Sequence, residues 1–169
     1  MTLMAVGCCD VPVVETVDRK GDGIKENLIN ANRLVAQSEE VQIDAYVERR
    51  GWQMTQLGGG ARVEELTTGS GRSIGYEDTV RLSYRLEALN GAVIYDGCTD
   101  TVVVGRLQPT RGLDAALRTL HYGSTARVIL PSEQAYGVVG DGDRVKSRMV
   151  LVYHLKVENN TLDIKQKQK

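Results

Sequence analysis

The chain has 169 residues, of which 41% are hydrophobic and 25% are charged, and these proportions are typical of a globular protein. Its 21 Lys and Arg residues nearly balance its 22 Asp and Glu residues, and no stretch is strongly basic, so the sequence gives no support for a nucleic-acid partner. Three cysteines provide neither a disulfide framework nor a metal-binding spacing. With seven Tyr, one Trp and no Phe, any aromatic-lined pocket must be built almost entirely from tyrosine.

The N-terminal residues carry a lipoprotein-like motif. Ala5-Val6-Gly7-Cys8 is similar to the box in which bacterial lipoproteins are cleaved and then acylated on the cysteine. The positively charged start and the longer apolar core of a secretory signal do not precede it. Two interpretations stay open. Acylation of Cys8 would tether a domain in the bacterial cell envelope, periplasmic or on the outer membrane, whereas incidental cysteines would leave a cytoplasmic protein. We interpret residues 1–23 as a signal remnant and a polar linker.

Residues 24–51 have a helical pattern. The apolar positions that recur at helical spacing are Ile24, Leu28, Ala31 and Val35. Ser38, followed by two glutamates, resembles a new helix start, and Gly51 is a plausible helix end. We therefore predict two short helices or one kinked helix. The apolar stripe would pack on its own domain or, alternatively, serve as an arm that pairs with a second copy of the chain.

The segment 54–158 has the sequence pattern of β-strands joined by turns. Apolar and polar residues alternate from Val80 to Ala88, and Asn90-Gly91 is a strong hairpin signal. The strands predicted here pass through Val63 and cover 80–88, 92–95, 101–104, 126–130 and 148–157, and a single helix is predicted at 110–122. A mostly antiparallel sheet with one helix packed across it is the economical α+β arrangement. The polar tail 159–169 is predicted to be disordered.

Four separated blocks and a closing strand, in the right order, resemble the FKBP family of prolyl isomerases. The blocks are Val80-Arg81-Leu82-Ser83-Tyr84, Asn90 to Asp96, Val104-Gly105 through Gly123, Leu130-Pro131-Ser132 through Gly137, and the strand Leu151 to Leu155. The second is similar to D-G-x-x-F-D, with Tyr for Phe and one extra residue. The resemblance covers about 100 residues and implies a curved, mostly antiparallel sheet wrapped on one short helix.

This resemblance also implies an activity and its partners. The chain would be a peptidyl-prolyl cis/trans isomerase, without metal or cofactor, that acts on proline-containing polypeptide clients. Together with the lipoprotein-like start, it would be an envelope member that assists folding of extracytoplasmic proteins. Related envelope isomerases use N-terminal helices as dimerisation arms, which is the origin of the homodimer alternative.

Site residues follow from the matched motifs. By resemblance, the apolar walls and floor around the proline ring would be Tyr84, Tyr95, Leu113 and Tyr153. Tyr136 would donate its hydroxyl to a substrate carbonyl, helped by the backbone N–H of Thr110. Asp96 would be the polar group beside the twisting carbonyl, with Tyr84 as its hydrogen-bond donor. Pro109 and Val145 would line the rim.

The chemistry requires a dry aromatic hollow and no nucleophile. Twisting the C–N bond costs about 18–20 kcal/mol of lost amide resonance, and an enzyme lowers that barrier by binding the twisted amide better than the planar one. Among the departures from the family pattern, Cys98-Thr99-Asp100-Thr101 carries no aromatic residue, and the flap reads Val145-Lys146, flanked by Arg144 and Arg148, which would make the pocket more polar. They favour a second interpretation, a weakly active or inactive binding module of the same fold that grips extended chains.

Overall fold

The structure is a computed structural model that describes residues 19–107 and 110–158, with side chains from Ile24 onward. The elements in chain order are α1 (Arg19–Arg50), β1 (Thr55–Gln56), η1 (Gly58–Gly60), β2 (Arg62–Thr67), β3 (Thr79–Ala88), β4 (Val93–Val103), α2 (Arg111–Leu117), β5 (Thr125–Leu130), η2 (Ser132–Gln134) and β6 (Leu151–Val157). The chain divides into two compact units, with the boundary between Arg33 and Leu34. The second unit thus includes the last part of α1, whereas the sequence was interpreted as a helical segment at 24–51 and a separate domain at 54–158.

The N-terminal helix differs from the prediction. It is one continuous helix, and it begins at Arg19, inside the segment predicted to be linker. Ser38 does not start a second helix, since α1 runs through it without a break, and its hydroxyl accepts a hydrogen bond from the Gln42 side chain one turn later (3.2 Å). A serine that bonds within its own helix does not interrupt it.

The end of α1 agrees with the prediction. Gly51 has a φ of +64°, in the left-handed region that favours glycine. Its N–H donates to the carbonyl of Glu48 (3.0 Å), and the N–H of Trp52 donates to that of Val47 (3.2 Å). This pair of bonds satisfies carbonyls of the last helical turn and turns the chain toward β1.

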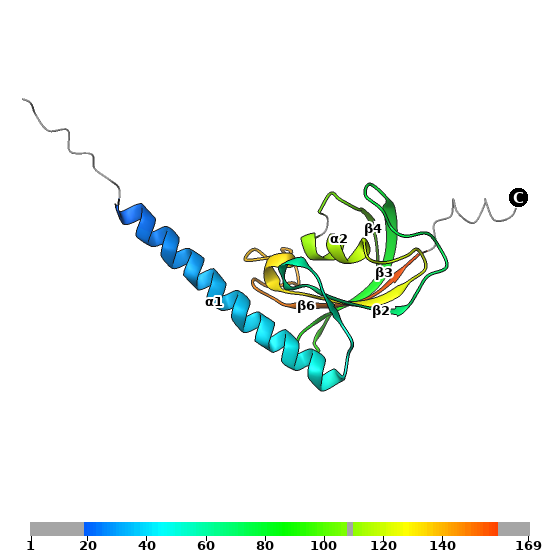
Figure 1. Cartoon of the computed structure of the whole chain (residues 1–169), viewed down its shortest axis with the longest axis horizontal. Helices are drawn as coiled ribbons and strands as arrows, with labels where there is room; N and C mark the ends of the chain where they lie inside the picture. The colour runs from blue at the N-terminus through cyan, green and yellow to red at the C-terminus, as the bar shows by residue number, and fades with distance from the viewer. Residues whose placement is uncertain (1–18, 108–109, 159–169) are drawn as a thin grey trace, which may run out of the picture. The chain divides into compact units, whose positions relative to one another are not determined.

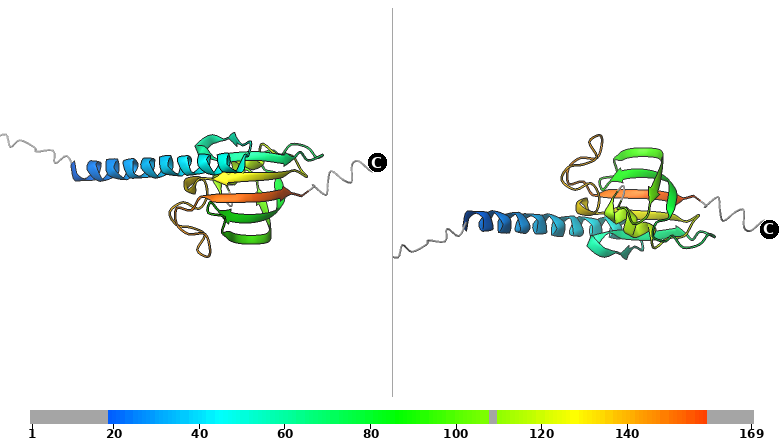
Figure 2. Two further views of the ribbon diagram at one scale, coloured as in Figure 1. Left: turned by 90° about the horizontal axis from the view of Figure 1, so that it is seen from below. Right: turned by 90° about the horizontal axis from the view of Figure 1, so that it is seen from above.

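The six strands form one antiparallel sheet in the order β1-β2-β5-β6-β3-β4, which confirms the predicted sheet type. In Figure 2, β6 runs between β5 and β3. Its Leu151, Tyr153 and Leu155 are buried on one face, and Val150 and Val152 are buried beside them. A strand with apolar residues on both sides suits this central position.

Two predicted segments have different lengths in the structure. The strands expected at 92–95 and 101–104 are one strand, β4, whose pairing with β3 shifts between Tyr84 and Leu86. The helix expected at 110–122 ends at Leu117, because Thr119 and Leu120 donate their N–H groups three residues back, to Ala116 and Leu117. Such tight bonds end an α-helix early.

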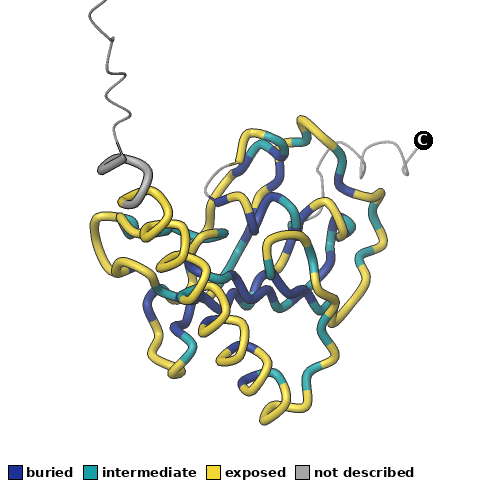
Figure 3. The backbone as a smooth tube through the Cα atoms, turned by 60° about the vertical axis from the view of Figure 1, so that its left-hand side comes forward, coloured by how far each residue is buried: buried dark blue, intermediate teal, exposed yellow. Residues whose placement is uncertain are grey.

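Apolar residues are buried on both faces of the sheet. The larger cluster contains Leu113, Leu117 and Leu120 of the α2 region, with Leu82, Leu86 and Tyr153 of the strands. On the opposite face, Ile43 and Tyr46 of α1 pack with Ile129, Val150 and Val152. Figure 1 shows α2 on one side of the sheet and the cyan end of α1 on the other, and Figure 3 shows the buried residues running through the strands.

Most of α1 is exposed. Ile24 and Leu28 of the predicted apolar stripe are 61% and 60% exposed, whereas Ile43 and Tyr46 are buried. Within the part of the chain that the structure describes, no helix combines the length and the apolar character needed to cross a membrane.

Candidate active site

Three tyrosines from separate segments meet on the face of the sheet that carries α2. The rings of Tyr84 on β3 and Tyr153 on β6 lie 5.6 Å apart between centroids, at an angle of 51°. Tyr136, from the segment after η2, is hydrogen-bonded to the hydroxyl of Tyr153. Tyr84 and Tyr136 are half-buried against the larger core cluster, and Tyr153 is 2% exposed. The sequence analysis predicted that these three residues lie near one another, and they do so in the structure.

Burial keeps these hydroxyl groups protonated. Burial raises the pKa of Tyr153 well above its usual value, and the neighbouring Tyr136 hydroxyl adds to the rise. The pKa of Tyr136 is also raised by burial, and that of Tyr84 is raised by burial and then by its hydrogen bond to Asp100. An ionised phenol is disfavoured in such surroundings. The three groups are therefore hydrogen-bond donors throughout the physiological pH range.

The carboxylate bonded to Tyr84 is Asp100, so the predicted hydrogen bond between Tyr84 and Asp96 is wrong. The Tyr84 hydroxyl donates to Asp100 Oδ2 at 2.7 Å. The Asp96 side chain is 65% exposed, and its nearest charged partner is Arg85, at 4.0 Å. Arg85 neighbours Tyr84 on β3 and therefore faces the opposite side of the sheet.

A strand irregularity explains the difference. Tyr84 pairs with Cys98, but Leu86 pairs with Tyr95, so β4 uses three residues where β3 uses two. Asp96 and Gly97 fill the extra length, as in a β-bulge. Directly opposed residues share a face, and therefore Asp100, which pairs with Leu82, lies on the same side as Tyr84.

Tyr95 joins the hairpin strand to the loop that follows Tyr136. Its hydroxyl donates to Asp141 Oδ2 at 2.6 Å, and Asp143 Oδ2 lies 3.2 Å away. The other Asp141 oxygen accepts the N–H groups of Asp143 and Val145, both at 2.9 Å. The bond to Asp141 raises the pKa of Tyr95 to about 12. The Asp141 carboxylate thus holds the backbone of the loop and attaches the loop to Tyr95.

The remaining predicted residues have mixed outcomes. Leu113 is 1% exposed and belongs to the larger core cluster, and its role as the floor of the site stays a prediction. Thr110 caps α2 by accepting the N–H of Leu113 on its hydroxyl (3.3 Å), and its backbone role toward a substrate stays a prediction. Val145 was expected at the rim, but it is 4% exposed and packs in the larger core cluster. Pro109 and Cys8 lie outside the described residues.

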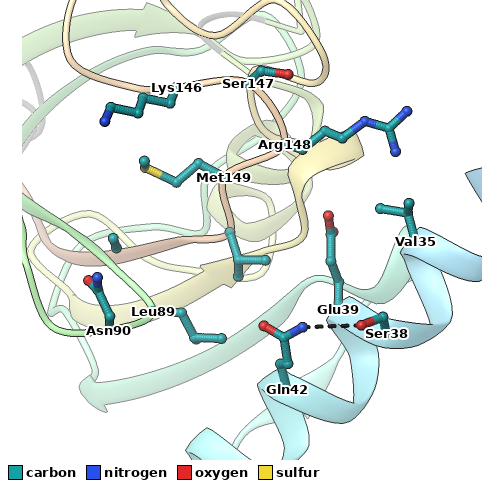
Figure 4. Close-up of a pocket in the computed structure, with 12 residues that line it drawn as sticks. Val35, Ser38, Glu39, Gln42, Leu89, Asn90, Lys146, Ser147, Arg148 and Met149 are labelled. Carbon is teal, nitrogen blue, oxygen red and sulfur yellow. Dashed lines mark hydrogen bonds between the residues drawn. The ribbon is translucent and has the colours of Figure 1, made fainter.

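The charged residues of the predicted flap line a cavity that is separate from the tyrosine cluster. A cavity of about 540 Å³ is bounded by α1, the turn after β3 and the segment before β6. Lys146 and Arg148, expected to make the isomerase pocket more polar, line this cavity together with Glu39 and Met149 (Figure 4).

Sequence reasoning missed two carboxylates of the site, Asp100 and Asp141. Asp100 could have been found by counting alternate positions back from Val102, an apolar residue of the same strand. The extra residue in the hairpin block was the sign that the register had to shift before that point. Asp141 stands between two glycines, a pattern typical of a turn, and it gives no sign of a partner some 46 positions away.

The structure is thus an α+β domain with partly buried tyrosines and a carboxylate gathered on one face of its sheet. The comparisons identify the family. The model of the FKBP-type peptidyl-prolyl cis-trans isomerase family matches residues 71–158, and the chain therefore belongs to that family.

Relatives agree with this assignment. A probable FKBP-type 25 kDa peptidyl-prolyl cis-trans isomerase of Pseudomonas aeruginosa is 32% identical over 108 residues, which are 64% of this chain and 47% of that protein. The chain thus spans about half the length of the curated relative it matches.

Two solved structures share the fold. The 1.6 Å crystal structure of a peptidyl-prolyl cis-trans isomerase from Pseudomonas syringae pv. tomato has a TM-score of 0.62 and 22% identity, covering 75% of this chain and 92% of that one. The AtFKBP13 structure has a TM-score of 0.56 and 18% identity, covering 62% and 95%.

Proposed function

We propose that the chain is a peptidyl-prolyl cis/trans isomerase that acts on proline-containing polypeptides. The observation that supports this most is the cluster of Tyr84, Tyr136 and Tyr153 with Asp100, which supplies apolar walls and protonated hydroxyl donors in one place. The family assignment points to the same activity.

The mechanism we propose is preferential binding of the twisted amide. The proline ring lies against Tyr84 and Tyr153, with Leu113 beneath it, because these surfaces exclude water. Tyr136 donates its hydroxyl to a carbonyl of the bound peptide and holds it while the C–N bond rotates. Asp100 fixes the Tyr84 ring and lies beside the rotating carbonyl. Each contact accelerates rotation only to the extent that it is stronger in the twisted state.

An exchange experiment tests this proposal. Cis/trans exchange of a short Xaa-Pro peptide, measured by NMR, is expected to be faster with the chain than in buffer. Tyr136→Phe is expected to slow it, because the hydroxyl donor is lost, while Asp96→Val is expected to leave it unchanged. Exchange equal to buffer would refute the isomerase proposal.

A binding module with little turnover is the second candidate. It is favoured by the absence of an aromatic residue between Cys98 and Thr101, which leaves one wall of the site to smaller side chains. Such a chain would still shift the tyrosine signals on adding a proline peptide while exchange stayed at the buffer rate. That combination separates the two candidates.

We also propose that the chain works in the bacterial cell envelope, tethered through acylated Cys8. Support comes from the motif Ala5-Val6-Gly7-Cys8. Expression in a bacterium with labelled palmitate is expected to label the wild type and Cys9→Ser but not Cys8→Ser. Equal labelling of both variants, or none in the wild type, would overturn the anchor. Assistance to folding of extracytoplasmic proteins is the role that this location implies.

A second copy of the chain is the partner we propose for the N-terminal helix. Ile24 and Leu28 are exposed one helical turn apart, and pairing with the same stripe of another copy would bury them. Sedimentation of the intact chain is expected to show a dimer, and the double variant Ile24→Glu, Leu28→Glu a monomer. A monomeric wild type would refute the pairing.

A further inference from the structure

We propose that Glu39 of α1 is a positioning residue for Tyr136, which makes the C-terminal part of this helix a component of the isomerase site. The inference rests on the proposed function, because Tyr136 is the residue that would hold the substrate carbonyl. It assigns a role in the site to a helix that precedes every sequence block of the family resemblance.

Glu39 is a buried carboxylate with both oxygens engaged. The residue is 6% exposed. Its Oε2 accepts the backbone N–H of Ser132 at 2.8 Å, and its Oε1 accepts the Ser132 hydroxyl at 2.6 Å. A buried charge is stable only with such donors. Figure 4 shows the Glu39 side chain on the side of α1 that faces the cavity, away from the exposed surface of the helix.

Glu39 provides an acceptor for the backbone N–H of Ser132, which the local structure does not provide. Ser132 begins the short helix η2, and the preceding Pro131 provides no side-chain cap. The first N–H groups of a helical turn need an acceptor from elsewhere. Because Ser132 is 2% exposed, water is a poor substitute, and Glu39 supplies the acceptor from another part of the chain.

Ser132 in turn fixes the residues on both sides of Tyr136. Its carbonyl accepts the N–H of Ala135 at 3.1 Å and that of Gly137 at 2.8 Å. Tyr136 lies between these two bonded neighbours. A movement of Ser132 therefore moves the backbone that carries the Tyr136 ring, and with it the hydroxyl that is bonded to Tyr153.

The helix that presents Glu39 is itself fixed. One turn further along α1, Ile43 is fully buried, and Tyr46 is 3% exposed, packed with Ile129 and Val152 of the sheet. Ile129 lies on β5, the strand that leads into Pro131 and Ser132. The same core thus holds both partners of the Glu39–Ser132 pair, as a positioning contact requires.

The test compares Glu39→Gln with Glu40→Gln, its exposed neighbour on the same helix. We expect Glu39→Gln to lower kcat/KM for an Xaa-Pro peptide by about tenfold, because small displacements of a binding group are costly. We also expect it to shift the NMR signals of Tyr136 and Gly137 without peptide. Glu40→Gln should change neither. A folded Glu39→Gln protein with wild-type kcat/KM and unshifted Tyr136 signals would overturn the proposal, as would equal effects of both variants.

A milder variant covers the case in which Glu39→Gln does not fold. Ser132→Ala removes the hydroxyl donor but keeps the backbone N–H bond to Glu39, and we expect smaller shifts of the same Tyr136 signals. Unshifted signals in folded Ser132→Ala would then overturn the proposal. The NMR readout needs no turnover. If the wild type lacks isomerase activity, the proposed function fails, while the shifts still support or overturn the link between Glu39 and Tyr136.

Discussion

The two aspartates of the hairpin strand provide a matched pair for testing the site. Asp100 accepts the Tyr84 hydroxyl at 2.7 Å on the face that carries Tyr153, whereas Asp96 lies on the other face with its side chain 65% exposed. We expect Asp100→Asn to lower kcat/KM and Asp96→Asn to leave it nearly unchanged. Both substitutions remove one negative charge from the same strand, so a general electrostatic effect would appear in both.

The expected size follows from the hydrogen bond that is weakened. A hydrogen bond to a charged group contributes about 1.5–3 kcal/mol. Asp100 is an exposed residue, so water competes for it and the lower end of this range applies. A loss of about 1.4 kcal/mol in the transition state is a tenfold change in rate. Only the part of this loss that is larger in the twisted state slows the reaction, so we expect kcat/KM to fall by up to about tenfold for Asp100→Asn, and by less than about twofold for Asp96→Asn.

A protease-coupled isomerisation assay with an Xaa-Pro peptide measures both variants beside the wild type. Thermal unfolding of each variant provides the control for folding. Equal losses in the two variants, or a loss confined to Asp96→Asn, would show that the strand irregularity has been misinterpreted and that Asp100 is not the carboxylate of the site.

Three further predictions concern the loop, the pH response and the floor of the site. Tyr95→Phe keeps the ring but loses the bond to Asp141, so hydrogen exchange of the loop after Tyr136 should become faster; unchanged exchange would contradict the attachment. Burial lowers the pKa of His154 below its usual 6.5, so the folded state binds this proton less tightly than the unfolded chain does. The free energy of unfolding, measured in urea, should therefore fall as the pH drops below 6.5, and it should fall less in His154→Gln. Parallel pH profiles of the wild type and His154→Gln would contradict this prediction. Leu113→Ala should lower that free energy by about 2–5 kcal/mol, because it removes buried methyl groups, and a loss below about 1 kcal/mol would show that the floor is not packed.

Much of the fold could be predicted from the sequence because its signals are local. Alternation from Val80 to Ala88 predicts a strand with one buried face, and the structure has β3 there. Gly51 marks the end of a helix through its own backbone preference. Such features depend on the residue and its near neighbours, and the sequence displays both.

The errors at Ser38 and Asp96 involve contacts between distant segments. Ser38 looks like a helix start on its own, but the helix continues through it to Ile43 and Tyr46, which are buried against the sheet. Asp96 fits the family motif, but the pairing of β3 with β4 decides which aspartate lies beside Tyr84. Tertiary packing and strand register thus overrode local patterns, and neither is visible in the alternation of a single segment.

The seven tyrosines of the chain offer the most direct test of the central claim, which is that proline peptides bind at one aromatic hollow. Ring signals of a tyrosine-labelled sample would be followed by NMR during titration with an Xaa-Pro peptide. We predict that four tyrosines respond, namely Tyr84, Tyr95, Tyr136 and Tyr153, and that three stay unchanged, namely Tyr46, Tyr76 and Tyr122. Shifts confined to Tyr46, Tyr76 and Tyr122, or the absence of any shift, would contradict the proposed site.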